Sequence, residues 1–493
     1  MRSAAALIGA LAPAVLAGTQ AKNVIYIVPD GYGQASQTMA RDYVSLLETS
    51  TTPRNPNIFE LAADDMTRGL VRTHASDNLI TDSASSGTAF ACGYKTYNNA
   101  VSVLEDGKTP VASILEAAKL AGMKTGLVVT STIFHATPAV YAAHAAHRNS
   151  YADIAAQEIG YTHPLGPVVD VLLGGGRCLF KPRSAAGSCR SDNVDLFGFA
   201  EENGYHVMQD RDAFDGLQKG LGDIRIPFIG LFNDDQMKYE IDRKIDQDEP
   251  SLVEMVETAV NALHRATHCK EQGYFLMVEA SRIDHAGHAN DPAAHLHDTI
   301  MYNDVMGFVR DWIDDHPDTV MMSAADHECG GLTLNGFNPL GLKDTRRSGE
   351  HIERVWRNRP AGVDPRAFLV SEILPEMGLA GATNAQINTI VSSSNPAREV
   401  LALLSARAGV HWSSGGHTAS DVTLFGYAAG DKADAFKAEL AGNFDNTELP
   451  RIVEKILGGA VDLDAATERL RANGTNWVSK RGLEQRSVSD HWH

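Results

Sequence analysis

Short, continuously apolar runs separated by helical patterns constrain the fold of this chain more than any other feature. Eight runs are predicted to be strands, at residues 23–28, 68–73, 124–129, 169–174, 227–232, 274–279, 319–324 and 422–428. Helices are predicted between them, for example over 109–122, with Thr109 as its cap, and over 251–267. Because strands that are apolar on both sides must be covered on both sides, we expect an α/β fold. The pattern favours a three-layer α/β/α sandwich with a central, mostly parallel sheet.

Residues 332–412 depart from this alternation. Stretches such as LNGFNPLGLKDTRRSGE resemble loops and are locally basic, so we expect an insertion rather than part of the sheet. We interpret the block as a loop-rich, crown-like subdomain inserted in the main domain. A lid and a dimer contact remain alternatives, because composition does not discriminate between them.

The N-terminus indicates the location of the protein, and the net charge restricts its partners. Arg2 followed by the apolar run AAALIGALAPAVLAG predicts a signal peptide over residues 1–21, with cleavage after Ala17 or Ala21. A buried N-terminal helix is the alternative, which Pro13 disfavours. No later apolar run is long enough to span a membrane. The formal net charge of -19 argues against nucleic acid as the main partner, since binding a phosphate backbone requires a basic surface. We therefore expect a secreted protein whose mature chain is one domain, residues 22–493.

The chain has five cysteines. Cys178 and Cys189 lie in a loop containing Gly and Pro, and in a secreted protein a local disulfide between them is expected. Partners for Cys92, Cys269 and Cys329 cannot be assigned from spacing, and the odd number leaves at least one thiol free.

Side chains that commonly bind metals lie at the ends of several predicted strands. In open α/β sheets, ligands bind beyond the carboxyl ends of the strands. A single Asp in such a place usually caps a turn, but here four carboxylates and several histidines would meet at one edge. Burying so many acids is costly unless cations accompany them, which predicts a group of divalent ions. The candidates are Asp30, His135, Thr137, Glu279, Asp284, His288, Asp326, His327 and His417.

The stretch NLITDSASSGTAFACGYKT, residues 78–96, is crowded with small residues. One interpretation is a flexible linker. The other is a helix that starts after Asp82 and presents Ser83 and free N–H groups to an anion. Ser83 would need activation to act as a nucleophile, and the chain has no G-x-S-x-G motif. A metal ion is therefore the expected activator.

Six segments together resemble the alkaline phosphatase family. They occur in the family's order between Asp30 and His417: PDGYG, TDSASSGTAFACGYKT, HATPAVYAAHAAHR, VEASRIDHAGH, AADHECGG and WSSGGHT. The resemblance implies that Ser83 is the nucleophile, that Arg148 holds the phosphate, and that the protein is a homodimer.

The resemblance also implies a set of metal ligands. A first zinc would take Asp284, His288 and His417; a second would take Asp30, Asp326 and His327; a magnesium would take Asp30, Thr137 and Glu279. Asp82, His135 and His285 would support these ligands, and His135 and His285 occupy positions that vary within the family.

The implied activity is hydrolysis of phosphate monoesters with broad specificity through a phosphoserine, with small phosphomonoesters and inorganic phosphate as the partners. A phosphodiesterase or sulfatase on the same sheet is one alternative. A secreted metal- or phosphate-binding protein without turnover is a second alternative. A storage or adhesive protein is a third alternative, which the expected cluster of buried acids disfavours.

Overall fold

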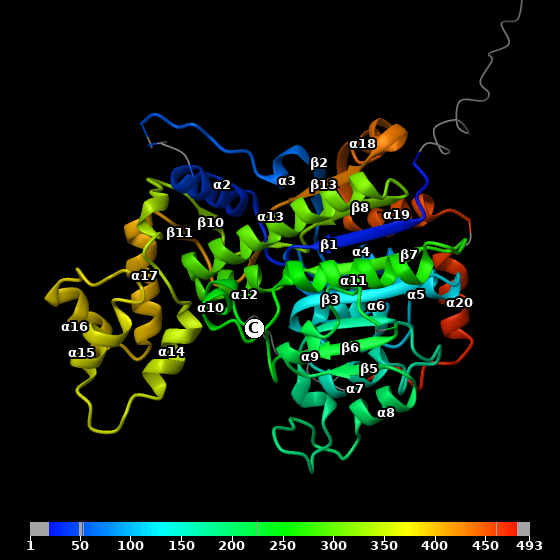
Figure 1. Ribbon diagram of the computed structural model, residues 1–493, viewed down its shortest axis with the longest axis horizontal. Coiled ribbons are helices and arrows are strands. Elements are labelled where there is room, and N and C mark those ends of the chain that lie inside the picture. Colours follow the sequence, from blue (N-terminus) through cyan, green and yellow to red (C-terminus); the bar gives the residue numbers. More distant parts are fainter. Residues whose placement is uncertain (1–18, 49–51, 53, 224, 460, 481–493) are drawn as a thin grey trace, which may run out of the picture.

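A computed structural model describes residues 19–48, 52, 54–223, 225–459 and 461–480. Its centre is a ten-stranded sheet with the order β14-β2-β13-β8-β1-β7-β3-β4-β6-β5 (Figure 1). The strands are β1 (Asn23–Val28), β2 (Thr67–Arg72), β3 (Lys124–Thr132), β4 (Val171–Gly175), β5 (His206–Met208), β6 (Phe228–Leu231), β7 (Tyr274–Glu279), β8 (Thr319–Ala324), β13 (Val422–Ala428) and β14 (Gly442–Asp445). Residues 1–18 of the expected signal peptide lie outside the described residues.

All eight predicted strands are present in this sheet, so the α/β prediction is confirmed. Two edge strands, β5 and β14, were not predicted. Their side chains are partly exposed and the segments are short, so neither carries a continuous apolar run. β13 pairs antiparallel with both of its neighbours, β8 and β2, whereas the other pairs in the sheet are parallel.

Helices cover both faces of the sheet (Figure 1). On one face α11 (Leu252–Thr267) and α13 (Pro292–Asp315) pack against the central strands, and on the other lie α5 (Ile114–Leu120), α6 (Ala136–Ala142) and α19 (Leu449–Leu457). The remaining α-helices among the described residues outside the block 332–412 are α2 (Gln34–Glu48), α3 (Ala62–Asp65), α4 (Ser83–Cys92), α7 (Tyr151–Glu158), α8 (Leu196–Glu202), α9 (Arg211–Asp215), α10 (Glu240–Asp246), α12 (Arg282–Ala289), α18 (Ala433–Glu439) and α20 (Leu463–Arg471). Every residue of β1 and β7 is buried, which explains their continuous apolar character.

The predicted helix over 109–122 begins later than expected. Val103 and Pro110 form a β-bridge, so the chain is not yet helical at Thr109. α5 starts at Ile114, where Ser113 and Glu116 form a reciprocal capping box. The prediction with Thr109 as cap was wrong because this capping box satisfies two backbone N–H groups, whereas Thr109 lies in a turn.

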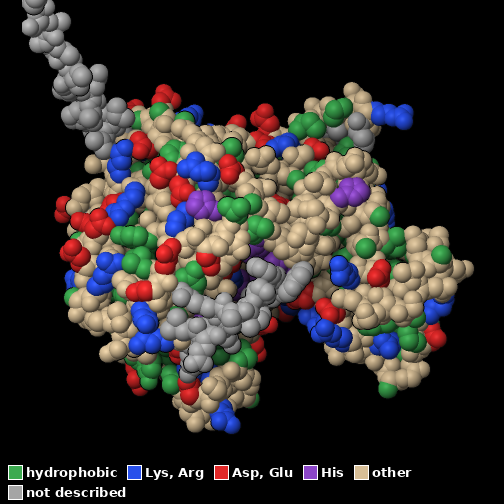
Figure 2. All heavy atoms as spheres, turned by 180° about the vertical axis from the view of Figure 1, so that it is seen from behind, with side chains coloured by type: hydrophobic (Ala, Val, Ile, Leu, Met, Phe, Trp, Pro, Cys, Tyr) green, Lys and Arg blue, Asp and Glu red, His purple; other side chains and the backbone are tan. Residues whose placement is uncertain are grey.

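The block 332–412 contains four α-helices joined by long connecting segments: α14 (Gly349–Arg357), α15 (Pro365–Phe368), α16 (Asn384–Ser392) and α17 (Pro396–Ala408). Ser348, Asp364, Thr383 and Asn395 accept hydrogen bonds as their N-caps. Some of the polar residues in this block are therefore helix starts. These helices form a lobe beside the sheet, and their apolar side chains join a second core that also contains Met39 and Tyr43 of α2 (Figures 1 and 2).

The expected disulfide is present: Cys178 and Cys189 are bonded, with their Cα atoms 5.1 Å apart. Cys92, Cys269 and Cys329 are free thiols. Among the described helices, none combines the length and the apolar character needed to cross a bilayer. On the face shown in Figure 2, Lys and Arg side chains are interspersed with Asp and Glu side chains.

Candidate active site and metal-binding groups

The site lies at the carboxyl edge of the sheet. β1 lies between β7 and β8 and is parallel to both, so the three strands end side by side. Glu279 is the last residue of β7, while Asp30 and Asp326 each follow their strand by two residues. All three carboxylates are completely buried. The strand ends thus bring together acids that are far apart in the sequence.

His417 reaches this edge by a different route, because it precedes its strand. It lies in β12 (His417–Thr418), which pairs with β9 (Glu328–Cys329), and β13 begins at Val422. Since β13 is antiparallel to β8, its beginning lies beside the end of β8. A parallel β13 would have placed His417 at the opposite edge.

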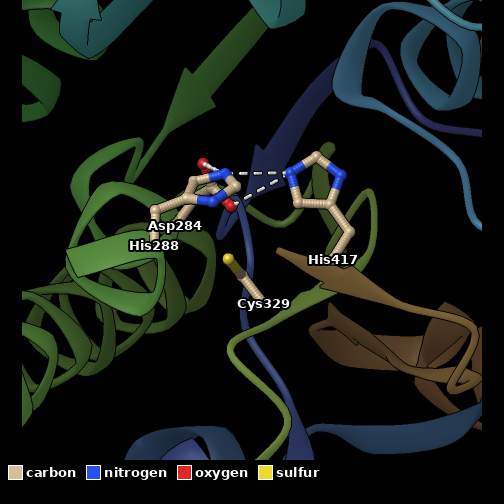
Figure 3. Close-up of side chains that lie close together, drawn as sticks. All are labelled: Asp284, His288, Cys329 and His417. Atoms are coloured by element: carbon tan, nitrogen blue, oxygen red, sulfur yellow. Dashed lines mark hydrogen bonds and ion pairs between the residues drawn. The ribbon is translucent and has the colours of Figure 1, made fainter. Parts of the chain in front are cut away.

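Asp284, His288, His417 and Cys329 form the first group that could hold a metal ion (Figure 3). Asp284 and His288 are four residues apart on α12 and therefore share a face of the helix. His288 Nε2 lies 3.2 Å from Asp284 Oδ2 and 3.1 Å from His417 Nε2. His417 Nε2 lies 3.5 Å from Asp284 Oδ1. The backbone carbonyl of Gly415 accepts from His288 Nδ1 at 2.7 Å, which leaves Nε2 as the ligand atom.

Two further groups share Asp30. One contains Asp30, Asp326 and His327, and the other contains Asp30, Glu279 and His135. His327 Nε2 lies 3.1 Å from Asp326 Oδ2 and 3.9 Å from Asp30 Oδ1. Thr137 follows His135 by two residues and is buried. Burial raises the pKa of Glu279, and the Thr137 hydroxyl partly opposes this rise. His135, to which the family resemblance gave a supporting role, has a nitrogen within 4.8 Å of the ligand atoms of Asp30 and Glu279.

The charges of these groups fit divalent cations. Neither carboxylate oxygen of Asp30 has a hydrogen-bond partner among the described residues. Burial, followed by the neighbouring Asp326, Asp284 and Glu279, raises the pKa of Asp30 well above its usual range. Burial likewise raises the pKa of Glu279 to about 7. A cation between these oxygens would offset both costs, and carboxylate and imidazole donors suit zinc and magnesium.

Ser83 is the first residue of α4, and the expected helix start is present there; the linker interpretation is excluded because the whole helix is buried. Asp82 caps the helix and accepts hydrogen bonds from the backbone N–H of Ser85 at 2.9 Å and of Asn99 at 3.0 Å. Ser83 Oγ lies 3.2 Å from His327 Nε2. The hydroxyl is therefore within reach of any ion that Asp326 and His327 hold.

Arg148 faces the same space. Its Nη1 donates to Asp82 Oδ2 at 3.0 Å, and its Nη2 lies 3.3 Å from His135 Nε2. Although burial favours the neutral acid, Arg148 lowers the pKa of Asp82. The guanidinium is thus fixed by a charged partner, and it lines a cavity of about 310 Å³ that Ser83 also lines. Figure 2 shows histidine side chains in a hollow on one face of the molecule.

A second cavity of about 990 Å³ adjoins the first, and His135, His285 and His288 line both. The rings of His135 and His285 meet edge to face, with centroids 5.3 Å apart. Burial and the neighbouring Arg282 lower the pKa of His285 to about 3, so this ring is neutral at neutral pH. The wider cavity leaves room for a substrate next to the metal-binding groups.

A further buried group of possible metal ligands, not predicted from the sequence, contains Glu116, His144 and His163. Glu116 Oε1 lies 2.9 Å from His144 Nε2 and 2.8 Å from His163 Nε2. His163 Nδ1 accepts from the backbone N–H of Leu165, so its Nε2 carries the proton and donates to Glu116. His144 Nδ1 donates to the Ser102 carbonyl, which leaves Nε2 to pair with the carboxylate. We interpret this group as a buried ion pair, and no spacing signal in the sequence links its members.

An α/β sheet that gathers carboxylates and imidazoles around a serine at a helix start is the arrangement of a metal-dependent hydrolase. The chain belongs to the alkaline phosphatase family, whose model matches residues 21–458. Membership implies a metal-dependent phosphatase that hydrolyses phosphate monoesters.

Relatives and solved structures agree with this membership. The chain is 36% identical over 487 residues to the repressible alkaline phosphatase of Saccharomyces cerevisiae, covering 91% of this chain and 83% of that protein. It is 37% identical over 486 residues to the alkaline phosphatase of Schizosaccharomyces pombe, covering 95% and 87%. The crystal structure of the Thermus thermophilus alkaline phosphatase superposes with a TM-score of 0.75 at 28% identity, covering 95% of this chain and all of that one.

Proposed function

We propose that this protein hydrolyses phosphate monoesters of broad specificity through a phosphoserine formed on Ser83, at a site that holds two zinc ions and one magnesium ion. The observation that carries the proposal is the position of the Ser83 hydroxyl, 3.2 Å from His327 Nε2 in a cavity that Arg148 also lines. A nucleophile, an anion-binding guanidinium and cation ligands therefore face one space.

The metal ligands are assigned as the three groups of side chains suggest. Asp284, His288 and His417 would hold one zinc. Asp30, Asp326 and His327 would hold the other. Asp30, Thr137 and Glu279 would hold the magnesium, with His135 close enough to join them. Bound divalent ions supply charge stabilisation to the attacking and leaving oxygens of a phosphoryl transfer.

The chain's own residues perform the remaining tasks. Ser83 Oγ attacks phosphorus and the alcohol leaves from the opposite side; water then attacks the phosphoserine and releases inorganic phosphate. Because Asp82 accepts from the N–H of Ser85, the N–H groups of Ser83 and Ala84 at the start of α4 would be the ones to attract the phosphate oxygens. Arg148 binds two nonbridging oxygens as a planar fork, and Asp82 orients that fork.

Arg148→Ala should weaken inhibition by inorganic phosphate by roughly 10- to 100-fold, because hydrogen bonds to charged groups contribute about 1.5–3 kcal/mol. Metal content should remain unchanged, since Arg148 is not a ligand. Inhibition constants and elemental analysis measure the two effects. Arg190→Ala is the matched control, because Arg190 is also a buried arginine paired with an aspartate, Asp192, and it lines neither cavity. Equal losses of metal and of phosphate binding in Arg148→Ala would contradict the assigned role.

Turnover of three nitrophenyl substrates tests the proposed activity. The monoester should be hydrolysed many times per chain, with the diester and the sulfate slower by orders of magnitude. A preference for the diester or the sulfate would favour the alternative enzymes. Stoichiometric phosphate binding without product release would instead indicate a binding protein.

Breadth of specificity follows from the adjoining 990 Å³ cavity, which leaves room for leaving groups of different shapes. We further propose that the protein is secreted after removal of residues 1–21, that residues 22–493 form the catalytic domain with 332–412 as an inserted subdomain, and that the enzyme is a homodimer. The cysteine pair and the family membership support secretion. Size measurement of the purified protein tests the dimer.

A further inference from the structure

We propose that Cys329 is a fourth ligand of the ion held by Asp284, His288 and His417. This inference rests on the proposed function only in taking that group as a metal site. It concerns this chain's own thiol, whose Sγ lies within 4.8 Å of the ligand atoms of the other three residues.

The backbone places Cys329 directly beside a ligand. In the short antiparallel ladder of β9 and β12, Cys329 is the register partner of His417. Residues directly opposite in such a ladder project to the same side, so the thiol and the imidazole point the same way. The N–H of Cys329 donates to the carbonyl of Gly31 at 3.0 Å, which ties the strand to the turn that carries Asp30. Cys329 is therefore fixed by the same backbone that positions two groups of metal ligands.

Helix α12 also confines the side chain of Cys329. A Cβ atom at Gly287 would lie 3.1 Å from Cys329 Sγ, so the absence of a side chain there lets the sulfur fit beneath the helix that carries Asp284 and His288. Cys329 is fully buried. Figure 3 shows its Sγ pointing toward the Asp284 carboxylate, on the side where the two imidazoles converge.

The distances suit a tetrahedral ion. The two Nε2 atoms of His288 and His417 are 3.1 Å apart, Asp284 Oδ2 lies 3.2 Å from His288 Nε2, and Asp284 Oδ1 lies 3.5 Å from His417 Nε2. Zinc bonds of about 2.0–2.1 Å to nitrogen and oxygen imply about 3.3 Å between neighbouring ligand atoms in a tetrahedron. The carboxylate and the two imidazoles are thus spaced for three corners of such a site, and Cys329 Sγ, within 4.8 Å of their ligand atoms, is available for the fourth. Asp284 Oδ1 is buried with no hydrogen-bond partner among the described residues, which points to a cation as its partner.

Coordination by Cys329 would change the chemistry of the group. The thiol proton would pass to solvent as the sulfur binds the ion, so the ligands would contribute two negative charges instead of one. A sulfur ligand also favours softer cations such as zinc or cadmium over magnesium or manganese. Because zinc can accept a fifth ligand, a sulfur ligand still permits a substrate to approach.

The competing role for Cys329 is positional: its S–H group would donate a hydrogen bond to Asp284 without contacting the ion. Cys329→Ser separates the two roles, because the serine hydroxyl keeps the donor and removes the sulfur. If Cys329 is a ligand, zinc affinity should fall by at least tenfold in this variant. If it only donates a hydrogen bond, zinc affinity should change by less than threefold.

The test uses the full chain, stripped of metal with a chelator and reloaded with Co²⁺. A cobalt–thiolate bond produces an intense charge-transfer absorption in the near ultraviolet, which oxygen and nitrogen ligands do not produce. We expect this band in the unmodified protein and in the controls Cys92→Ser and Cys269→Ser, and its loss in Cys329→Ser. Zinc affinity is measured in parallel by competition with a chelator.

A band that persists in Cys329→Ser, or unmodified protein that binds Co²⁺ by elemental analysis without the band, would overturn the proposal. The second outcome needs no variant, so a folding defect of Cys329→Ser leaves the proposal testable. Hydrolysis of nitrophenyl phosphate by the zinc-loaded protein is measured separately. A missing band with intact hydrolysis rejects the sulfur ligand alone, whereas absent hydrolysis rejects the proposed function.

Discussion

Ser83→Ala should lower kcat by a factor of about 10³ or more and abolish covalent labelling by phosphate, because the variant lacks the nucleophile. The unmodified enzyme, quenched with acid after incubation with labelled substrate, should retain phosphate on one tryptic peptide that contains residue 83. The Ser83 hydroxyl reaches the site because Asp82 caps α4 and holds the first turn at the carboxyl edge of the sheet.

Ser85→Ala is the matched control on the same helix. Ser85 is equally buried, but its hydroxyl donates to the carbonyl of Thr96 and does not face the metal-binding groups. We expect this variant to keep covalent labelling and most of its activity. Labelling that survives in Ser83→Ala would refute the assignment of the nucleophile.

Asp30→Asn should remove metal from two groups at once, because Asp30 belongs to both. The loss of metal affinity at each of the two groups should exceed the roughly 10- to 100-fold loss that is typical when a residue supporting a metal ligand is replaced. Activity should fall with metal content, and prolonged chelation of the unmodified protein should have the same consequence. Elemental analysis should find two ions fewer per chain in Asp30→Asn and one fewer in Asp284→Asn.

The same substitution should affect stability in opposite directions with and without metal. Burial and neighbouring carboxylates raise the pKa of Asp30, so without a cation its charged form destabilises the fold increasingly as pH rises. A neutral Asn removes that cost. Asp30→Asn should therefore raise the melting temperature of the metal-free protein at neutral pH and lower that of the metal-loaded protein.

Asp298→Asn provides the control for this effect. Asp298 is also fully buried, and burial followed by Glu240 raises its pKa, but it belongs to none of the metal-binding groups. Its substitution should also stabilise the metal-free protein while leaving metal content unchanged. Full metal content in Asp30→Asn would contradict the bridging role of Asp30.

The strands were predictable because their signal is local. Strands β1 and β7 are buried on both sides, so each appears in the sequence as an unbroken apolar run. Carboxyl ends of parallel strands meet at one edge, so Asp30, Glu279 and Asp326 could be placed together before any contact was known. The edge strands β5 and β14 lack such a run, and the helices of 332–412 were hidden by the polar residues that cap them.

The sequence by itself determined the α/β sheet and the kinds of side chain at its carboxyl edge, because residue type and apolar periodicity depend only on near neighbours along the chain. Only the tertiary structure decided that β13 runs antiparallel and so carries His417 to that edge. It also decided that Arg148 is held by Asp82, and that Cys329 lies opposite His417. These contacts join segments far apart in the sequence, and their geometry depends on how the sheet and its helices pack.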